Sequence, residues 1–145
     1  MPQYTSQGIV YSIVIAIAAQ EDLAAIAKDD PETETEIVAV LQELKGNQAL
    51  LDVLTVKDFG LAHDAPFHVD AWMAQQQKGR NLWRLKIWNL EDFGIRYRVV
   101  YALDPRISRY YILAVLHRGF NYDEGHPRVK KLLATYDRLG IPAYR

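Results

Sequence analysis

The chain of 145 residues contains no cysteine. This absence excludes disulfide bonds and thiolate metal sites, and it fits a reducing compartment, so we expect a cytoplasmic protein. A long apolar run is also lacking: GIVYSIVIAIAAQ, from Gly8, is shorter than the roughly 20 residues that a membrane helix needs. No lysine or arginine precedes Lys28, so the stretch lacks the basic flank of a signal peptide. We expect a buried strand here, and no membrane association.

Basic residues are scarce in the first half of the chain and abundant in the second. Residues 1–77 carry three basic and twelve acidic side chains, whereas residues 78–145 carry fourteen basic and six acidic ones. Two interpretations stay open: a basic face that binds phosphate, and two halves of one domain that attract each other. The length favours a single domain over residues 1–145.

Local patterns in the first half predict one strand and a pair of helices. The strand is expected over residues 9–17, and the first helix over 18–28. The second helix is expected to begin with Asp30 as its N-cap and Pro31 as its first residue, and to end near residue 44. One more helical piece is expected at 48–56. Residues 57–81 are interpreted as loop, with some helix around 69–77.

Three strands are expected in the second half, over residues 82–89, 95–103 and 109–116. The gaps between them are too short for a crossover helix, so the strands predict an antiparallel meander. The third strand is apolar on both faces and is expected to be central, beside the first strand. A last helix over 127–139 ends at Gly140. The predicted order is β-α-α-β-β-β-α, an α+β fold whose mainly antiparallel sheet is packed against helices on one face.

Alternation along the strands gathers basic side chains on one face of the predicted sheet. The second and third predicted strands each place two cations opposite an apolar face, namely Arg84 and Lys86, and Arg96 and Arg98. No carboxylate is expected among them. Arg118 follows the last strand beside Tyr122, and such a set of cations and rings is typical of RNA binding. Solvated cations on a half-exposed sheet are the alternative.

The second half resembles the RelE/ParE superfamily of bacterial type II toxins. The resemblance covers residues 82–139 and is carried by LWRLKI, IRYRVVYAL, RYYILAVLHRGFNY and YDRLG in that order. Its RelE branch implies a ribosome-dependent mRNA endonuclease that blocks translation. The partners implied are mRNA on the ribosome and a cognate antitoxin, assembled with the toxin as a hetero-oligomer. A ParE-like gyrase inhibitor and a non-catalytic interaction domain of the same fold remain alternatives.

The resemblance also implies which residues form the site. Arg84 and Lys86 match the basic pair of the family's Leu-x-Leu strand. Arg98 matches the arginine of the Tyr-Arg-x-x-Tyr strand, and Arg118 matches the arginine that ends the last strand. Tyr122 matches the tyrosine that stacks on a base.

RNA can be cut without a metal by its own 2′-hydroxyl, given a base, an acid and a cation for the developing phosphorane charge. Arg98 and Arg118 suit the cation's part, because a guanidinium binds phosphate bidentately. An unperturbed imidazole changes charge near neutrality, which makes His117 a candidate acid–base group, and Lys86 is a candidate if its neighbouring arginines lower its pKa. Tyr122 is the stacking candidate. No cofactor and no metal are expected.

The histidines leave alternatives open. By alternation His117 shares the face of Leu113 and Val115, so an ordinary core or edge histidine is the alternative to a catalyst. His63 and His68 lie five residues apart, a spacing that invites a metal site, but without a helix or a second motif we interpret them as surface loop residues.

Overall fold

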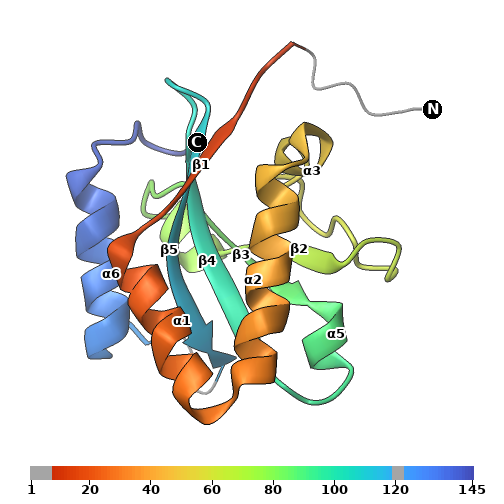
Figure 1. Ribbon diagram of the computed structural model, residues 1–145. Coiled ribbons are helices and arrows are strands. Elements are labelled where there is room, and N and C mark those ends of the chain that lie inside the picture. Colours follow the sequence, from red (N-terminus) through yellow and green to blue (C-terminus); the bar gives the residue numbers. More distant parts are fainter. Residues whose placement is uncertain (1–7, 119–122) are drawn as a thin grey trace.

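The computed structural model describes residues 8–118 and 123–145. In that part of the chain the strands form one five-stranded sheet in the order β1-β5-β4-β3-β2 (Figure 1). Its members are β1 (Ser12–Ile15), β2 (Phe67–Ala71), β3 (Leu82–Ile87), β4 (Tyr97–Asp104) and β5 (Arg109–His117). β1 runs parallel to β5, and all other neighbours are antiparallel. The predicted α+β class, the meander and the central place of the last strand beside the first are therefore confirmed.

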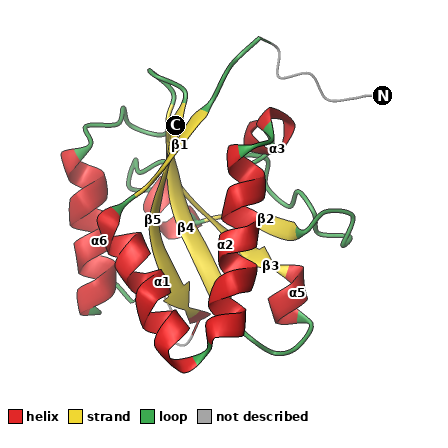
Figure 2. Cartoon of the chain, viewed as in Figure 1, coloured by secondary structure: helices red, strands yellow, loops and turns green. Residues whose placement is uncertain are grey.

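The described residues also form six helices (Figure 2). They are α1 (Ile17–Asp29), α2 (Pro31–Lys45), α3 (Gln48–Asp52), α4 (Met73–Gln76), α5 (Trp88–Glu91) and α6 (Pro127–Arg138). The predicted N-cap of α2 is confirmed, since Asp30 Oδ1 accepts a hydrogen bond from the Thr33 amide at 3.1 Å. None of these helices is long and apolar enough to cross a membrane.

Three local predictions are wrong. β1 is shorter than residues 9–17 and lies at a sheet edge, where its side chains alternate between exposed and half-buried instead of being buried. The helix expected around 69–77 is replaced by β2 and the single turn of α4, because FHVDA pairs along its whole length with β3. The strand expected over 82–89 ends at Ile87, because Trp88 begins the helical turn α5.

Helices cover both faces of the sheet, not one face as predicted. α1 and α2 cross the front of the sheet in Figure 1, and α6 lies on its other side. The core under α1 and α2 takes its sheet residues mainly from one set of alternating positions: Trp83, Leu85, Ile87, Val99, Tyr101, Tyr110, Ile112 and Val115. The core under α6 takes the other set: Leu82, Val100, Ala102, Leu113, Ala114 and Leu116. Both alternating sets are apolar in the middle of the sheet, so the sheet separates two cores.

A β-bulge interrupts the alternation in the middle of β5. Tyr101 pairs with Ile112 whereas Val100 pairs with Ala114, so Leu113 is an extra residue in β5. Simple alternation from Ile112 therefore predicts the wrong side of the sheet for every residue of β5 after Leu113. The expectation that His117 shares a face with Leu113 is wrong for this reason.

A largely buried ion pair, 15% and 16% exposed, covers the open side of β5 around the bulge. β1 pairs with β5 only as far as Ile112, so the following residues of β5 have no strand on that side. There the Asp22 carboxylate on α1 accepts the Val115 amide at 2.9 Å, and Arg128 of α6 donates to the Leu113 carbonyl at 3.0 Å. Asp22 and Arg128 also bind each other through two hydrogen bonds of 2.9 and 2.7 Å. The pair thus joins the acidic half of the chain to the basic half.

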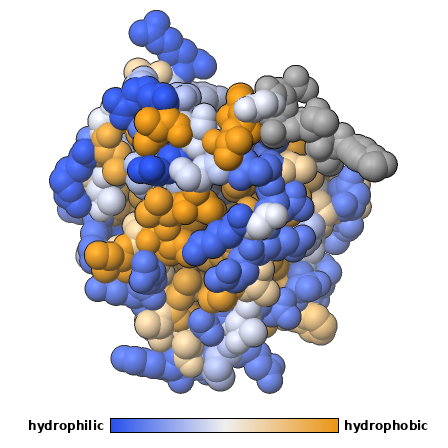
Figure 3. All heavy atoms as spheres, turned by 45° about the horizontal axis from the view of Figure 1, so that its top comes forward, coloured by the Kyte–Doolittle hydropathy of each residue, from blue (hydrophilic) through white to orange (hydrophobic). Residues whose placement is uncertain are grey.

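A glutamine side chain covers the outer edge of the sheet where β1 begins. Gln48 accepts the Tyr11 amide at 2.7 Å and donates to the Tyr11 carbonyl at 2.9 Å, as a neighbouring strand would. An apolar area is visible on the side of the molecule that Figure 3 turns forward. The exposed large apolar side chains of β1 and its flanks are Ile9, Val10, Val14 and Ile17. Blocking the backbone at such an edge limits strand-to-strand association.

Candidate nucleic-acid interface

Five cations share the side of the sheet that carries α6, and we call them the cationic face: Arg84, Lys86, Arg96, Arg98 and Arg118. Arg84 pairs with Val100 and Arg98 pairs with Leu116, and both partners belong to the core under α6. Lys86 and Arg96 follow by alternation. The prediction that two neighbouring strands place their cations together is therefore confirmed.

The bulge decides which side chain of the sequence His-Arg joins this face. β4 begins at Tyr97 and β5 ends at His117, and just beyond this last pair the Arg118 amide donates to the Arg96 carbonyl at 2.9 Å, which sets the backbone of Arg118 beside that of Arg96. If Leu113 instead paired with Val100, His117 would stand opposite Arg96. The extra residue thus gives the cationic face an arginine and sends the histidine to the other side.

Arg96 and Arg118 are the exposed part of the cationic face. Their backbones are neighbours, and like charges repel when the two guanidinium groups approach each other. No carboxylate within residues 8–118 and 123–145 forms an ion pair with either guanidinium. An anion that binds between the two would relieve this repulsion, and a phosphate group suits paired guanidinium groups.

The inner cations of the face are neutralised within the chain. Arg98 donates to Glu91 at 2.8 Å, and the two side chains are only 12% and 13% exposed. Arg84 Nη2 lies 3.4 Å from Asp70 Oδ2. The expectation of a face without carboxylates is thus wrong, because Asp70 comes from the unpredicted β2 and Glu91 from the unpredicted α5.

Lys86 lies beside a group of stacked rings at the β2 edge. Its ammonium is 5.1 Å from the centre of the Trp88 ring, a cation–π distance. His68 stands opposite Lys86 in the β2–β3 ladder, is 8% exposed, and places Nε2 3.0 Å from Asp58 Oδ1. The interpretation of His68 as a surface loop residue is therefore wrong. His63 is in the loop as expected, stacked on Trp88 with ring centres 3.6 Å apart.

His117 lies on the α1 and α2 side, away from the cationic face. Its ring meets Tyr97 edge-on, with ring centres 5.2 Å apart. Both side chains line a hollow of about 380 Å³ together with Asp22, Asp29 and Arg128. Burial, and then the nearby negative charge of Asp30 and Asp29, raises the pKa of Tyr97. The structure therefore does not bring His117 together with the arginines.

Of the predicted site residues, Arg84, Lys86 and Arg98 lie on one side of the sheet and Arg118 follows the end of β5 beside Arg96, whereas Tyr122 lies outside the described residues. Alternation already placed Arg96 on the same face as Arg98, but the resemblance gave Arg96 no role in the site. In the described part of the chain, no group of three or more histidine and carboxylate side chains is arranged to hold a metal ion. Comparisons of the chain with protein-family models, with curated proteins and with solved structures find no match.

Proposed function

We propose that this chain is the toxin of a toxin–antitoxin pair, a cytoplasmic endoribonuclease that binds ribosome-bound mRNA through the cationic face. The observation that carries the proposal is the exposed pair Arg96 and Arg118, whose backbones are joined by a 2.9 Å hydrogen bond and whose side chains form no ion pair with a carboxylate of the described residues. A phosphate group suits two neighbouring arginines, because each guanidinium can donate two hydrogen bonds to phosphate oxygens. The resemblance of residues 82–139 to RelE-like toxins supplies the substrate class.

The proposed reaction uses the RNA's own 2′-hydroxyl. A base takes the proton of the 2′-hydroxyl as its oxygen attacks the adjacent phosphorus, and an acid gives a proton to the 5′ oxygen as its bond to phosphorus breaks, which leaves a 2′,3′-cyclic phosphate and a 5′-hydroxyl. Arg96 and Arg118 hold the phosphate and stabilise its developing negative charge. Lys86 is the proposed acid–base group and Tyr122 the proposed stacking group. The place of His117 on the other side of the sheet argues against a role in this chemistry.

The test is expression of the chain in bacteria and cleavage of mRNA on purified ribosomes, mapped by primer extension. The wild-type chain is expected to arrest growth and to cut mRNA. The variant R96A/R118A is expected to lose both effects while remaining folded. The variant K130A/R138A is the matched control, because it removes the same charge from exposed positions of α6 and is expected to keep both effects.

Binding of single-stranded RNA gives a second readout. Each lost phosphate contact lowers the slope of log affinity against log salt by about 0.7, so R96A/R118A is expected to lower it by about 1.4. Unchanged cleavage and an unchanged slope in that variant would rule out this site. A wild-type chain that leaves translation intact but induces a DNA damage response would instead indicate a gyrase inhibitor.

A non-catalytic interaction domain is the second candidate, and one observation favours it. Arg98, the arginine that the resemblance assigns to phosphate, is buried against Glu91 at 2.8 Å and is only 12% exposed. RNA binding without any cleavage, on or off the ribosome, is the result expected from that candidate.

A further inference from the structure

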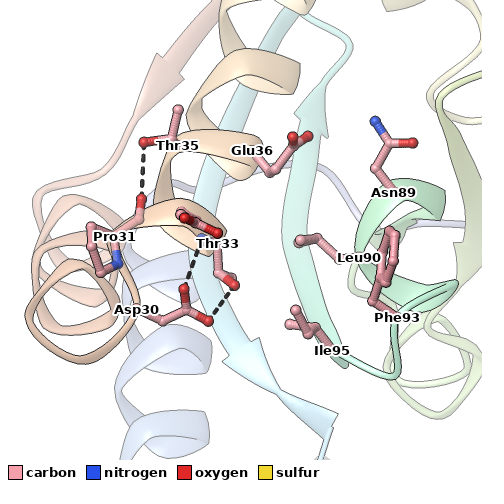
Figure 4. Close-up of a pocket in the computed structure, with 10 residues that line it drawn as sticks. Asp30, Pro31, Thr33, Thr35, Glu36, Asn89, Leu90, Phe93 and Ile95 are labelled. Atoms are coloured by element: carbon pink, nitrogen blue, oxygen red, sulfur yellow. Dashed lines mark hydrogen bonds between the residues drawn. The ribbon is translucent and has the colours of Figure 1, made fainter.

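A groove of about 660 Å³ lies between the first two turns of α2 and the segment that contains α5 and the loop to β4 (Figure 4). It is on the α1 and α2 side of the sheet, because Leu90 and Ile95 at its base belong to the core there. The cationic face is on the other side. A molecule in the groove therefore leaves the cationic face open, and the proposal below does not rest on RNA binding.

The base of the groove and one of its walls are apolar. In Figure 4, Leu90 and Phe93 stand across the groove from α2, with Ile95 below them. Phe93 is 82% exposed, whereas Leu90 is only 3% exposed. A phenylalanine ring with that exposure has a large apolar area to bury in a complex, and aromatic residues are enriched at protein interfaces.

The opposite wall is acidic. Glu32 and Glu36 are one turn apart on α2, both are exposed, and both line the groove. No lysine or arginine of the described residues forms an ion pair with either glutamate. Their charge excludes a phosphate-bearing ligand and favours a cationic one.

We propose that this groove binds an amphipathic helix of another protein, one that carries lysine or arginine beside its apolar stripe. The apolar stripe packs on Phe93 and Leu90, and the cations meet Glu32 and Glu36. A helix suits the site because Glu32 and Glu36 are four residues apart. Side chains four residues apart on the bound helix lie on one face of it, so two of its cations can meet the two glutamates. Recognition of a helix through anchors at such spacings is a common mode of peptide binding.

The test uses a fluorescein-labelled 16-residue peptide of leucine, alanine and lysine with leucines at helical spacing, and a second peptide with glutamate in place of lysine. Fluorescence anisotropy is expected to show binding of the lysine peptide only. Phe93→Ala and the pair E32Q/E36Q are each expected to weaken binding about tenfold. Glu43→Gln on the same helix and Ile107→Ala on the β4–β5 turn are exposed controls outside the groove and are expected to have no effect.

Two results would overturn the proposal. The first is equal binding of both peptides, or binding that Phe93→Ala leaves unchanged. The second is self-association of the wild-type chain in sedimentation velocity that Phe93→Ala abolishes, because the groove would then hold a second copy of the chain.

Discussion

Removing the guanidinium from the Asp22–Arg128 pair is predicted to destabilise the fold strongly. The side chains are only 16% and 15% exposed, and together they satisfy the Val115 amide and the Leu113 carbonyl at the bulge. Arg128→Met keeps most of the side-chain volume but leaves the Asp22 carboxylate with the Val115 amide as its remaining described partner. A buried charge left unpaired in this way costs about 3–5 kcal/mol.

The expected loss is about 3 kcal/mol, the lower end of that range, because water still reaches about a sixth of each side chain. This corresponds to a fall in Tm of roughly 10 °C for a chain of this size. The double variant D22N/R128M removes both charges while the asparagine oxygen can still accept the Val115 amide. It is expected to cost only about 1–2 kcal/mol, which is less than Arg128→Met alone.

Urea unfolding followed by far-UV circular dichroism measures these free energies. The chain supplies a matched control on the same two helices: Glu21 and Lys131 lie 3.6 Å apart but are 65% and 58% exposed. Lys131→Met is expected to change the free energy of unfolding by less than about 0.5 kcal/mol. The reasoning is refuted if Arg128→Met costs no more than Lys131→Met, or if the double variant is less stable than Arg128→Met.

Three further changes test other parts of the fold. Gly60→Ala is expected to lower the melting temperature markedly, because Gly60 has a φ of +81° and an added Cβ would lie 1.8 Å from the Phe67 carbonyl oxygen; a Tm within 2 °C of wild type, measured by scanning calorimetry, would contradict this. Gln48→Ala is expected to cost about 1–2 kcal/mol and to speed aggregation detected by light scattering, because it exposes the Tyr11 edge; equal aggregation rates would contradict this. The hydrogen bonds from Arg106 hold the pKa of Asp104 below its ordinary value. The stability that the Asp104 carboxylate contributes is therefore complete above about pH 4 and is lost as the pH falls through the lowered pKa. Asp104→Asn is expected to flatten that part of the curve when the free energy of unfolding is measured against pH.

Alternation predicted much of the second half of the fold correctly. The β3 and β4 strands carry enough apolar residues at regular spacing to reveal both their position and their faces, and the apolar run of β5 reveals its position. The N-cap of α2 was predictable because the cap is local: Asp30 and Thr33 are three residues apart. The prediction that helices cover only one face of the sheet was wrong. The second face is also apolar in the middle of the sheet, at Val100 and Ala102, and this apolar surface needed a helix, α6, to cover it.

The rest of the candidate site depended on long-range pairing. β2 is too short and too polar to be recognised alone, and its strand character comes from its pairing with β3. The partners of Arg84 and Arg98 were missed because Asp70 lies in that strand and Glu91 in a single helical turn. The bulge at Leu113 leaves no signature in an apolar run, so the side of the sheet that His117 faces could not be predicted from the sequence.

The bulge has a consequence for any comparison of this chain with a sequence that lacks it. The β4–β5 turn fixes Asp104 opposite Arg109, so residues of β5 are naturally counted from that turn. Consider a sequence in which this strand pairs regularly. Counted from the turn, its residue at the position of His117 faces the equivalent of Arg96. An alignment without a gap would therefore match His117 to a place that Arg118 holds in three dimensions. A one-residue gap opposite Leu113 keeps equivalent side chains together, and the assignment of site residues across sequences depends on where that gap is placed.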